Sequence, residues 1–194
     1  TPHLAVFAIG YDTDRQFARE LRTTDFTPPQ ARGAGLAPDP VHEGRMAGGA
    51  EAFLARLTGP IRHATEAGVA IDPARRSLWG HSFGGLFTLY ALIQAPEAFA
   101  RFICTSPSIW WDAPRMQALM QSAERPQDAP ELLFIVGNRE KRSGAGGPVP
   151  TTPPRDTLAF MAALSAWRGV AHDSIILDGA VHIAALHRSL PLAL

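Results

Sequence analysis

Five residues, Gly80-His81-Ser82-Phe83-Gly84, match the pattern G-x-S-x-G that surrounds the nucleophile of many serine hydrolases. The pattern follows a short strand predicted at 77–79 and opens an apolar helix predicted at 83–94. This context would hold Ser82 on a tight, strained turn, with its hydroxyl above the edge of a sheet. Glycines two positions before and after the serine would let the strand and helix backbones approach closely. The sequence therefore predicts that Ser82 is a nucleophile.

A serine hydroxyl becomes a good nucleophile only beside a base, and His182 is the predicted base. It follows the last predicted strand, 174–177, after a short turn, so that a loop would return it to the serine. His172 precedes that strand and would lie at the wrong edge of the sheet. His187 falls within the terminal helix, where a surface position is expected.

The acid that orients the histidine should leave a strand between Ser82 and His182 in the chain. Glu140 lies four residues beyond the strand predicted at 132–136 and is the favoured candidate. Three other carboxylates remain open, namely Asp112 after an earlier strand, Asp156 as a predicted helix cap, and Asp178 in the loop before the histidine.

The elements that must position these residues alternate between apolar strands and helices. Strands are predicted at 4–9, 77–79, 102–105, 132–136 and 174–177. Helices are predicted at 53–64 with a kink at Pro60, and at 83–94, 114–122, 156–167 and after His182, while 11–49 reads as one long loop. Continuous apolar strands separated by helices indicate a parallel sheet covered on both faces. The predicted fold class is therefore α/β, as a three-layer α/β/α sandwich.

Length and charge narrow the function classes further. The chain has 194 residues, and 46 % of them are hydrophobic, which is enough for one domain with a sizeable core. Basic and acidic residues number 18 each, so net charge gives no reason to expect a nucleic-acid or membrane partner. No apolar run approaches the roughly 20 residues of a transmembrane helix.

Other chemistries find little support in the residues. The sequence has no H-E-x-x-H motif and no glycine-rich phosphate loop that ends in Lys-Ser or Lys-Thr. Its one cysteine, Cys104, lies in a predicted strand and is expected in the core. No metal or organic cofactor is therefore expected.

Several further blocks give the chain a family resemblance. They are Ala8-Ile9-Gly10-Tyr11-Asp12-Thr13, Arg22-Thr23-Thr24-Asp25-Phe26-Thr27-Pro28, Gly48-Gly49-Ala50-Glu51-Ala52-Phe53-Leu54, Gly80-His81-Ser82-Phe83-Gly84-Gly85-Leu86 and Ser106-Pro107-Ser108-Ile109-Trp110-Trp111. In this order they resemble the esterase D-like α/β-hydrolases. Within these, the chain is similar to the branch of ferric-siderophore esterases of the enterobactin, salmochelin and bacillibactin type.

The resemblance implies a serine esterase that cleaves carboxylic esters through an acyl-enzyme. It assigns the nucleophile to Ser82, the base to His182 and the acid to Glu140, while the Phe83 amide would support the oxyanion. It also implies a small-molecule ester substrate, with a ferric catecholate siderophore as the candidate and iron arriving with it.

Four residues are candidates for substrate binding. Tyr11 and Arg22 lie in the first two blocks of the resemblance. Trp110 and Trp111 follow a strand at the carboxyl edge of the sheet, where ligands of open α/β sheets bind. Their indoles could stack on catechol rings, and at least one of the two is expected in the core.

The sequence departs from its relatives before Leu4, where they carry a further strand and the loop that supplies a second oxyanion amide. We therefore expect that the protein extends upstream of Thr1 and that 1–194 is one incomplete α/β-hydrolase domain. We also expect this chain alone to be weakly active or paired with another copy of itself.

Two other functions stay open. One is a general acyl-ester or thioester hydrolase, and the other is a catalytically inactive hydrolase fold that serves as a binding module. Relatives include cytoplasmic and periplasmic proteins, so the bacterial compartment stays open as well.

Overall fold

The computed structural model describes residues 4–124, 126, 130–141, 146–167 and 169–194. The chain divides into two compact units, one that ends at Ile71 and takes in Leu194, and one that spans Asp72–Ala193. The expectation that 1–194 forms one domain stays a prediction.

The second unit is built on a parallel sheet of four strands. These are β3 (Ser77–His81), β4 (Arg101–Thr105), β5 (Glu131–Gly137) and β6 (Ala171–Leu177), in the order β3-β4-β5-β6. Every neighbouring pair is parallel, and one register row runs through Gly80, Cys104, Phe134 and Ser174. The predicted parallel sheet is thus confirmed, and its four carboxyl ends meet at one edge.

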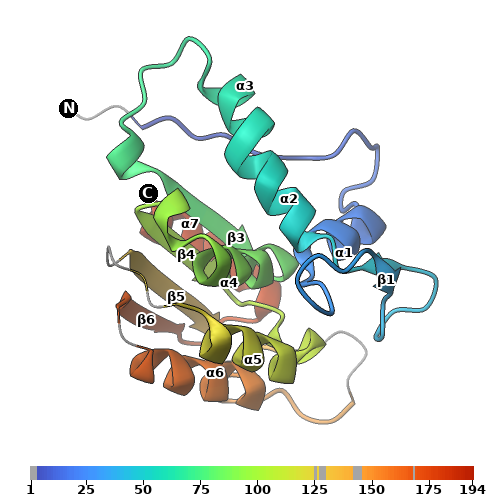
Figure 1. The fold of residues 1–194 in the computed structure, drawn as a ribbon. Coiled ribbons are helices and arrows are strands. Elements are labelled where there is room, and N and C mark those ends of the chain that lie inside the picture. Colours follow the sequence, from blue (N-terminus) through green and yellow to red (C-terminus); the bar gives the residue numbers. More distant parts are fainter. Residues whose placement is uncertain (1–3, 125, 127–129, 142–145, 168) are drawn as a thin grey trace. The chain divides into compact units, whose positions relative to one another are not determined.

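Helices connect these strands, as parallel pairing requires. They are α4 (Phe83–Gln94), α5 (Ala113–Ser122) and α6 (Arg155–Ala166), and a fourth helix, α7 (His182–Ala193), follows the last strand. Three short 3₁₀ turns lie between the longer elements, namely η2 (Pro73–Arg75), η3 (Pro96–Ala98) and η4 (Ile109–Trp111). Figure 1 shows α4, α5 and α6 on one face of the sheet and α7 on the other.

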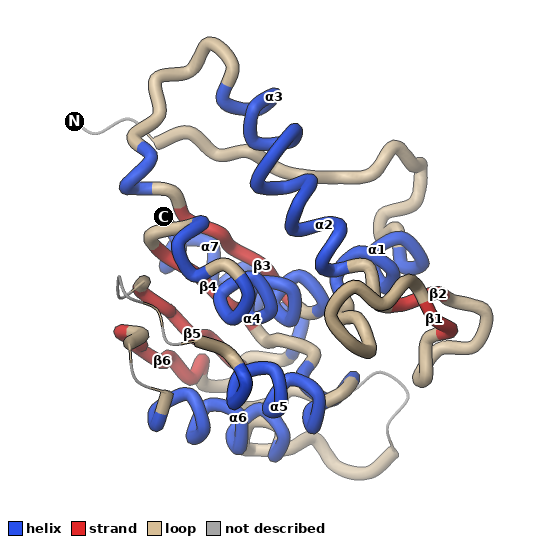
Figure 2. Tube along the Cα trace, in the orientation of Figure 1, coloured by secondary structure: helices blue, strands red, loops and turns tan. Residues whose placement is uncertain are grey.

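Alternation along the strands explains these three layers. Ile103, Leu133, Ile135 and Leu177 pack in one cluster with Ala185 of α7. The intervening Phe102, Leu132 and Phe134 are buried and point to the opposite face, because successive strand side chains alternate. The predicted α/β/α sandwich is therefore present in this unit, and Figure 2 shows its strands between the helices.

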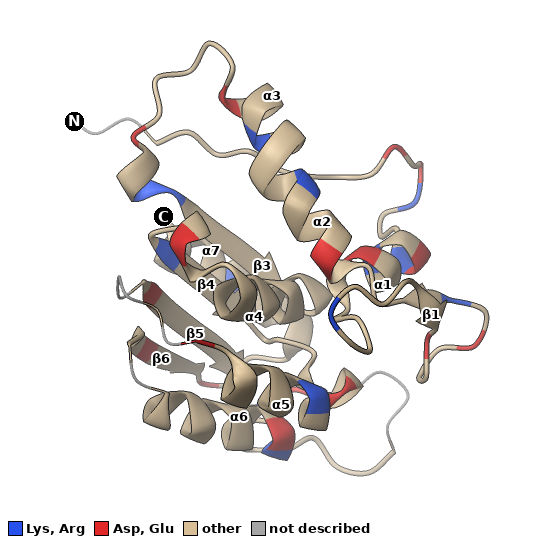
Figure 3. Cartoon of the chain, viewed as in Figure 1, with Lys and Arg blue, Asp and Glu red and all other residues tan. Residues whose placement is uncertain are grey.

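Helix α4 is buried along most of its length. All its residues from Gly85 to Ile93 are buried, and it contains no charged residue, as Figure 3 shows. A helix that is apolar all round belongs in an interior. It packs against β3 and β4, so the turn at its start is held between well-anchored elements.

The first unit consists of short elements. They are α1 (Arg19–Phe26), β1 (Ala37–Pro38), β2 (Met46–Ala47), α2 (Ala50–Arg56), the π-helical turn η1 (Leu57–Ile61) and α3 (Arg62–Glu66). Strands β1 and β2 pair in antiparallel fashion. The kink expected at Pro60 is confirmed, because Pro60 lies in the π-helical turn and Gly59 has non-helical angles of φ −107° and ψ −106°.

Two expectations for this unit were wrong. The strand predicted over 4–9 does not form, because no described strand pairs with it, and the side chains of Leu4 and Val6 are 64 % and 69 % exposed. The loop predicted over 11–49 contains α1, β1 and β2. Helix α1 is too polar for its apolar spacing to reveal it, and Thr23 is its only buried residue.

The capping prediction for α6 was also wrong. The residue at the N-cap is Pro154, and Asp156 lies inside the first turn, where a negative charge still favours the helix N-terminus.

None of the helices within the described ranges is long and apolar enough to cross a membrane.

Candidate active site

Ser82 occupies a strained turn between β3 and α4. Its φ of 62° and ψ of −120° place it in a region that L-residues rarely adopt. A Cβ on Gly80 would come within 2.2 Å of the Gly84 oxygen, and one on Gly85 within 2.8 Å of the Thr105 oxygen. A Cβ on Gly84 would meet nothing within 4 Å, so the second glycine that close packing requires is Gly85.

Three predicted residues meet at the carboxyl edge of this sheet. The Nε2 atom of His182 lies 3.0 Å from Oγ of Ser82. Its Nδ1 atom lies 3.0 Å from Oε2 of Glu140. Because a carboxylate only accepts, Nδ1 carries the proton and Nε2 is left to accept from the serine hydroxyl. The imidazole is therefore arranged to take a proton from Ser82.

Glu140 is a buried carboxylate whose oxygens are both engaged. Its Oε1 accepts hydrogen bonds from the Ser106 hydroxyl and, at 2.7 Å, from the Gly137 N–H. Burial by itself would raise the pKa of Glu140, but the hydrogen bonds from His182, Ser106 and Gly137 outweigh it and hold the pKa below its ordinary value. Glu140 is thus kept ionised beside the imidazole.

Two serines of the Ser106-Pro107-Ser108 segment belong to the site, although no role was predicted for them. Ser106 has a φ of 44° and is buried, with its hydroxyl on Glu140. The Ser108 hydroxyl lies 3.3 Å from Oγ of Ser82, and the Ser108 N–H donates to the Ser82 carbonyl. The signal that could have identified them as site residues was their position directly after β4, at the same sheet edge as Ser82.

The loop that carries Glu140 is fastened to the loop that carries His182. The Asn138 side chain donates to Oδ1 of Asp178 and accepts from the Gly179 N–H, both at 2.8 Å. The Arg139 N–H donates to the Ala180 carbonyl at 3.0 Å. The acid and the base therefore have a common support.

The other carboxylates and histidines have different partners. Asp112 caps α5 through the Arg115 N–H and pairs with the Arg115 side chain at 2.7 Å. Asp178 accepts the hydrogen bond from the Asn138 side chain described above. His172 lies in β6, and its Nε2 atom is 3.2 Å from the Ser165 hydroxyl. Of the carboxylates proposed from the sequence, Glu140 is the one whose contact with His182 the structure shows.

The aromatic residues near the turn divide into one core and one half-buried side chain. Trp111 is 5 % exposed, which agrees with the expectation that at least one tryptophan is core. Trp110 is half-buried, with its ring centroid 6.0 Å from that of Phe83. The roles predicted for Trp110 in substrate binding and for the Phe83 amide in oxyanion support stay predictions.

Tyr11 and Arg22 lie in the first unit. The Tyr11 hydroxyl donates to Oδ2 of Asp25 at 3.0 Å, and burial, followed by the Asp25 charge, raises the Tyr11 pKa. The Arg22 guanidinium lies 5.7 Å from the Phe26 ring centroid, and burial lowers its pKa. Their predicted role in substrate binding stays a prediction.

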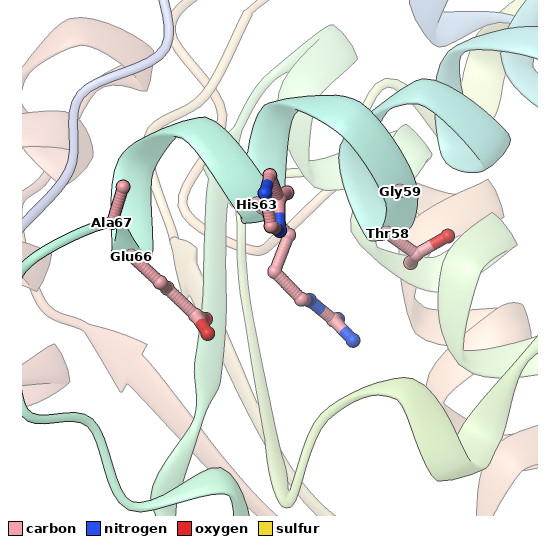
Figure 4. A pocket seen from close by; sticks show the side chains of 6 residues that line it. Thr58, Gly59, His63, Glu66 and Ala67 are labelled. Carbon is pink, nitrogen blue, oxygen red and sulfur yellow. The ribbon is translucent and has the colours of Figure 1, made fainter.

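The kinked helical segment of the first unit lines an open cavity of about 390 Å³ (Figure 4). Its lining residues are Thr58, Gly59, Arg62, His63, Glu66 and Ala67. None of them was predicted as a site residue.

Cys104 is fully buried in β4, as expected, and burial raises the pKa of its thiol. Among the residues that the structure describes, no group of three His, Cys, Asp or Glu side chains could hold a metal ion.

Known proteins resemble this chain in sequence and fold. The family model described as "Putative esterase" matches residues 40–172, which include Ser82 and Glu140. The ferri-bacillibactin esterase BesA of Bacillus subtilis is 37 % identical over 109 residues, which make up 56 % of this chain and 37 % of that protein. The siderophore triacetylfusarinine C esterase of Aspergillus fumigatus is 29 % identical over 188 residues, 93 % of this chain and 58 % of that protein.

The chain thus spans between 37 and 58 % of the length of these two curated relatives. Among solved structures, the BES protein from Bacillus cereus superposes with a TM-score of 0.70 at 24 % identity, over 95 % of this chain and 68 % of that one. The fold class predicted from the sequence is confirmed. Since the family match covers more than half of the chain, the chain belongs to the family described as putative esterases, with an α/β-hydrolase fold, and it resembles the siderophore esterases named above.

Proposed function

We propose that this chain carries the catalytic centre of a serine esterase that cleaves carboxylic esters through an acyl-enzyme. The observation that supports the proposal most directly is the line of hydrogen-bonding groups from Ser82 through His182 to Glu140, with 3.0 Å at each step. A buried carboxylate, an imidazole and a serine on a strained turn form the arrangement that nucleophilic ester cleavage needs.

In the first half of the reaction, Oγ of Ser82 attacks the ester carbonyl carbon while its proton passes to Nε2 of His182. Glu140 holds the Nδ1 proton and stabilises the imidazolium that forms. The negative charge on the former carbonyl oxygen is supported by the N–H of Phe83, at the N-terminus of α4. When the intermediate collapses, the C–O bond of the ester breaks and His182 gives its proton to the leaving alkoxide.

In the second half, His182 takes a proton from water as the water oxygen attacks the acyl-enzyme. The bond to Oγ of Ser82 then breaks, and the serine recovers its proton from His182. The products are a carboxylic acid and an alcohol, and the three side chains return to their starting state. No metal takes part in these steps.

The substrate class that we propose is the siderophore ester. The relatives named above are a ferri-bacillibactin esterase and a siderophore triacetylfusarinine C esterase, so both names give an ester of an iron carrier or its ferric complex as the substrate. The half-buried Trp110 beside Phe83 offers an aromatic surface next to the nucleophile. A general acyl-ester or thioester hydrolase is the alternative that substrate comparison must exclude.

The decisive experiment is labelling of the nucleophile together with ester turnover. A fluorophosphonate should phosphonylate Oγ of Ser82 with loss of fluoride, and mass spectrometry should locate this adduct, while a chromogenic short-chain ester should be hydrolysed. Ser82→Ala should lose both labelling and turnover, whereas Ser122→Ala, which alters an exposed serine of α5, should keep both. An unlabelled wild-type Ser82 would overturn the proposal and favour the inactive binding module.

The substrate class is tested separately. We expect kcat/KM for a ferric catecholate trilactone to exceed that for simple acyl esters and acyl thioesters. Equal or higher values for the simple substrates would assign the protein to general ester or thioester hydrolysis.

A further inference from the structure

His81, the residue before Ser82, contacts His182 at two points. The Nε2 atom of His81 lies 3.0 Å from the backbone oxygen of His182, so the ring N–H donates to that carbonyl. The two ring centroids lie 4.6 Å apart, with 40° between the ring planes. The last residue of β3 is thereby joined to the first residue of α7.

We propose that His81 is a positioning residue for His182, which holds the imidazole in the geometry that proton transfer from Ser82 requires. This inference rests on the proposed function, in which His182 is the base.

The need for such a residue follows from the directions of the other contacts. Ser82 and Glu140 bond the two ring nitrogens of His182, and such bonds lie near the plane of the imidazole. They resist movement within that plane more strongly than movement out of it. The His182 side chain is 38 % exposed, whereas that of Glu140 is 7 % exposed, so packing encloses the base less than the acid. The tilted ring of His81 restrains movement of the His182 imidazole out of its plane, which the two hydrogen bonds resist only weakly.

The same residue of β4, Thr105, holds both His81 and the nucleophile Ser82 in place. His81 is paired with Thr105 of β4, and the neighbouring Ser82 N–H donates to the Thr105 carbonyl at 3.0 Å. Ser82 and His81 therefore share one rigid strand end. A base that is held by His81 keeps its distance to the serine even when the loop before it moves.

Two variants separate the two contacts. His81→Gln keeps an N–H donor at a similar reach but removes the ring, while His81→Phe keeps a ring but removes the donor. We expect each to lower kcat about 10- to 100-fold, the range that a misplaced reacting group costs, with little change in KM. His187→Gln and His187→Phe change an exposed histidine of α7 and should leave both constants unchanged.

The second readout is the proton NMR resonance of the His182 Nδ1–H that bonds Glu140, recorded without substrate. We expect it to shift or broaden in both His81 variants and to stay in place in the His187 variants. Chemical unfolding of each variant shows that the comparison is made on folded protein, and if His81→Phe fails to fold, His81→Gln decides alone.

The two proposals fail in different ways. An unchanged resonance and unchanged kcat in folded His81 variants would overturn the positioning role, whatever happens to stability. A wild-type chain without ester turnover would overturn the proposed function, and the resonance would still decide whether His81 orients His182.

Discussion

The hydroxyl of Ser106 donates a hydrogen bond to Oε1 of Glu140, and both residues are buried. Ser106 accepts a φ of 44° to make this contact, a left-handed conformation that costs an L-residue roughly 1–2 kcal/mol. A serine in a conformation that favours glycine, bonded to the acid, indicates that its side chain is needed there.

Ser106→Ala and Ser106→Gly should therefore have similar effects on catalysis and different effects on stability. Both lose the hydrogen bond to Glu140 and should lower kcat by about 10- to 100-fold. Only glycine relieves the backbone, so Ser106→Gly should be more stable than Ser106→Ala by roughly 1 kcal/mol in chemical unfolding. Unaltered kcat in both variants would show that Ser106 does not help to place the acid.

Glu140→Gln should cost far more activity than Asp112→Asn. The amide cannot hold the His182 Nδ1 proton as the carboxylate does, and loss of the orienting acid in a serine protease lowers kcat by about 10⁴-fold. Asp112 caps α5 and pairs with Arg115, so its replacement should affect stability more than turnover. Steady-state kinetics on a chromogenic ester measure the ranking, and the opposite ranking would transfer the role of the acid to Asp112.

The same carboxylate should make stability depend on pH. Hydrogen bonds hold the pKa of Glu140 below its ordinary value of 4.5, so the folded state favours the ionised form more than the unfolded chain does. The resulting stabilisation is present above the unfolded pKa and is lost as pH falls through the folded pKa.

The difference in unfolding free energy between wild type and Glu140→Gln should therefore shrink from about pH 5 downward. Urea unfolding at a series of pH values measures it. A difference that stays constant with pH would mean that Glu140 titrates alike in both states.

Asn138 should matter because it joins the loop of the acid to the loop of the base. Asn138→Ala removes the bonds to Asp178 and Gly179 and should lower kcat several-fold with little change in KM. The double variant Asn138→Asp with Asp178→Asn exchanges donor and acceptor and should recover most of the loss. Absence of recovery, with both proteins folded, would argue that the amide does not act through this pair.

The two neighbouring tryptophans should respond differently to replacement by alanine. Trp110 is half-buried beside Phe83, so Trp110→Ala should raise KM for an aromatic siderophore by roughly 2- to 10-fold and leave a small acetyl ester nearly unaffected. Trp111 is 5 % exposed, and Trp111→Ala should cost about 3–5 kcal/mol of stability. Equal changes in KM for both substrates would limit Trp110 to a structural role.

The sequence by itself determined the parts of this protein that depend on local pattern. Continuous apolar runs predicted β4, β5 and the buried helix α4, because burial on both sides requires apolar residues throughout. The glycines around Ser82 predicted the tight turn, because only residues without a side chain allow the approach that Gly80 makes to Gly84. Chain order and strand ends predicted His182 as the base and favoured Glu140 as the acid, while Asp112, Asp156 and Asp178 stayed open.

Only the tertiary structure decided what depends on contacts between distant segments. The run 4–9 has the composition of a strand, but a strand also needs a partner, and no described strand supplies one. Ser106, Ser108 and His81 lie in blocks that carry the family resemblance, but the blocks alone do not reveal which side chains they contact. They reach Glu140, Ser82 and His182 because parallel strands bring their carboxyl ends to one edge, across 26 to 101 positions in the chain. Hydrogen bonds over such separations depend on the register of the sheet. That register depends on how distant strands pair, so no single segment of the sequence predicts it.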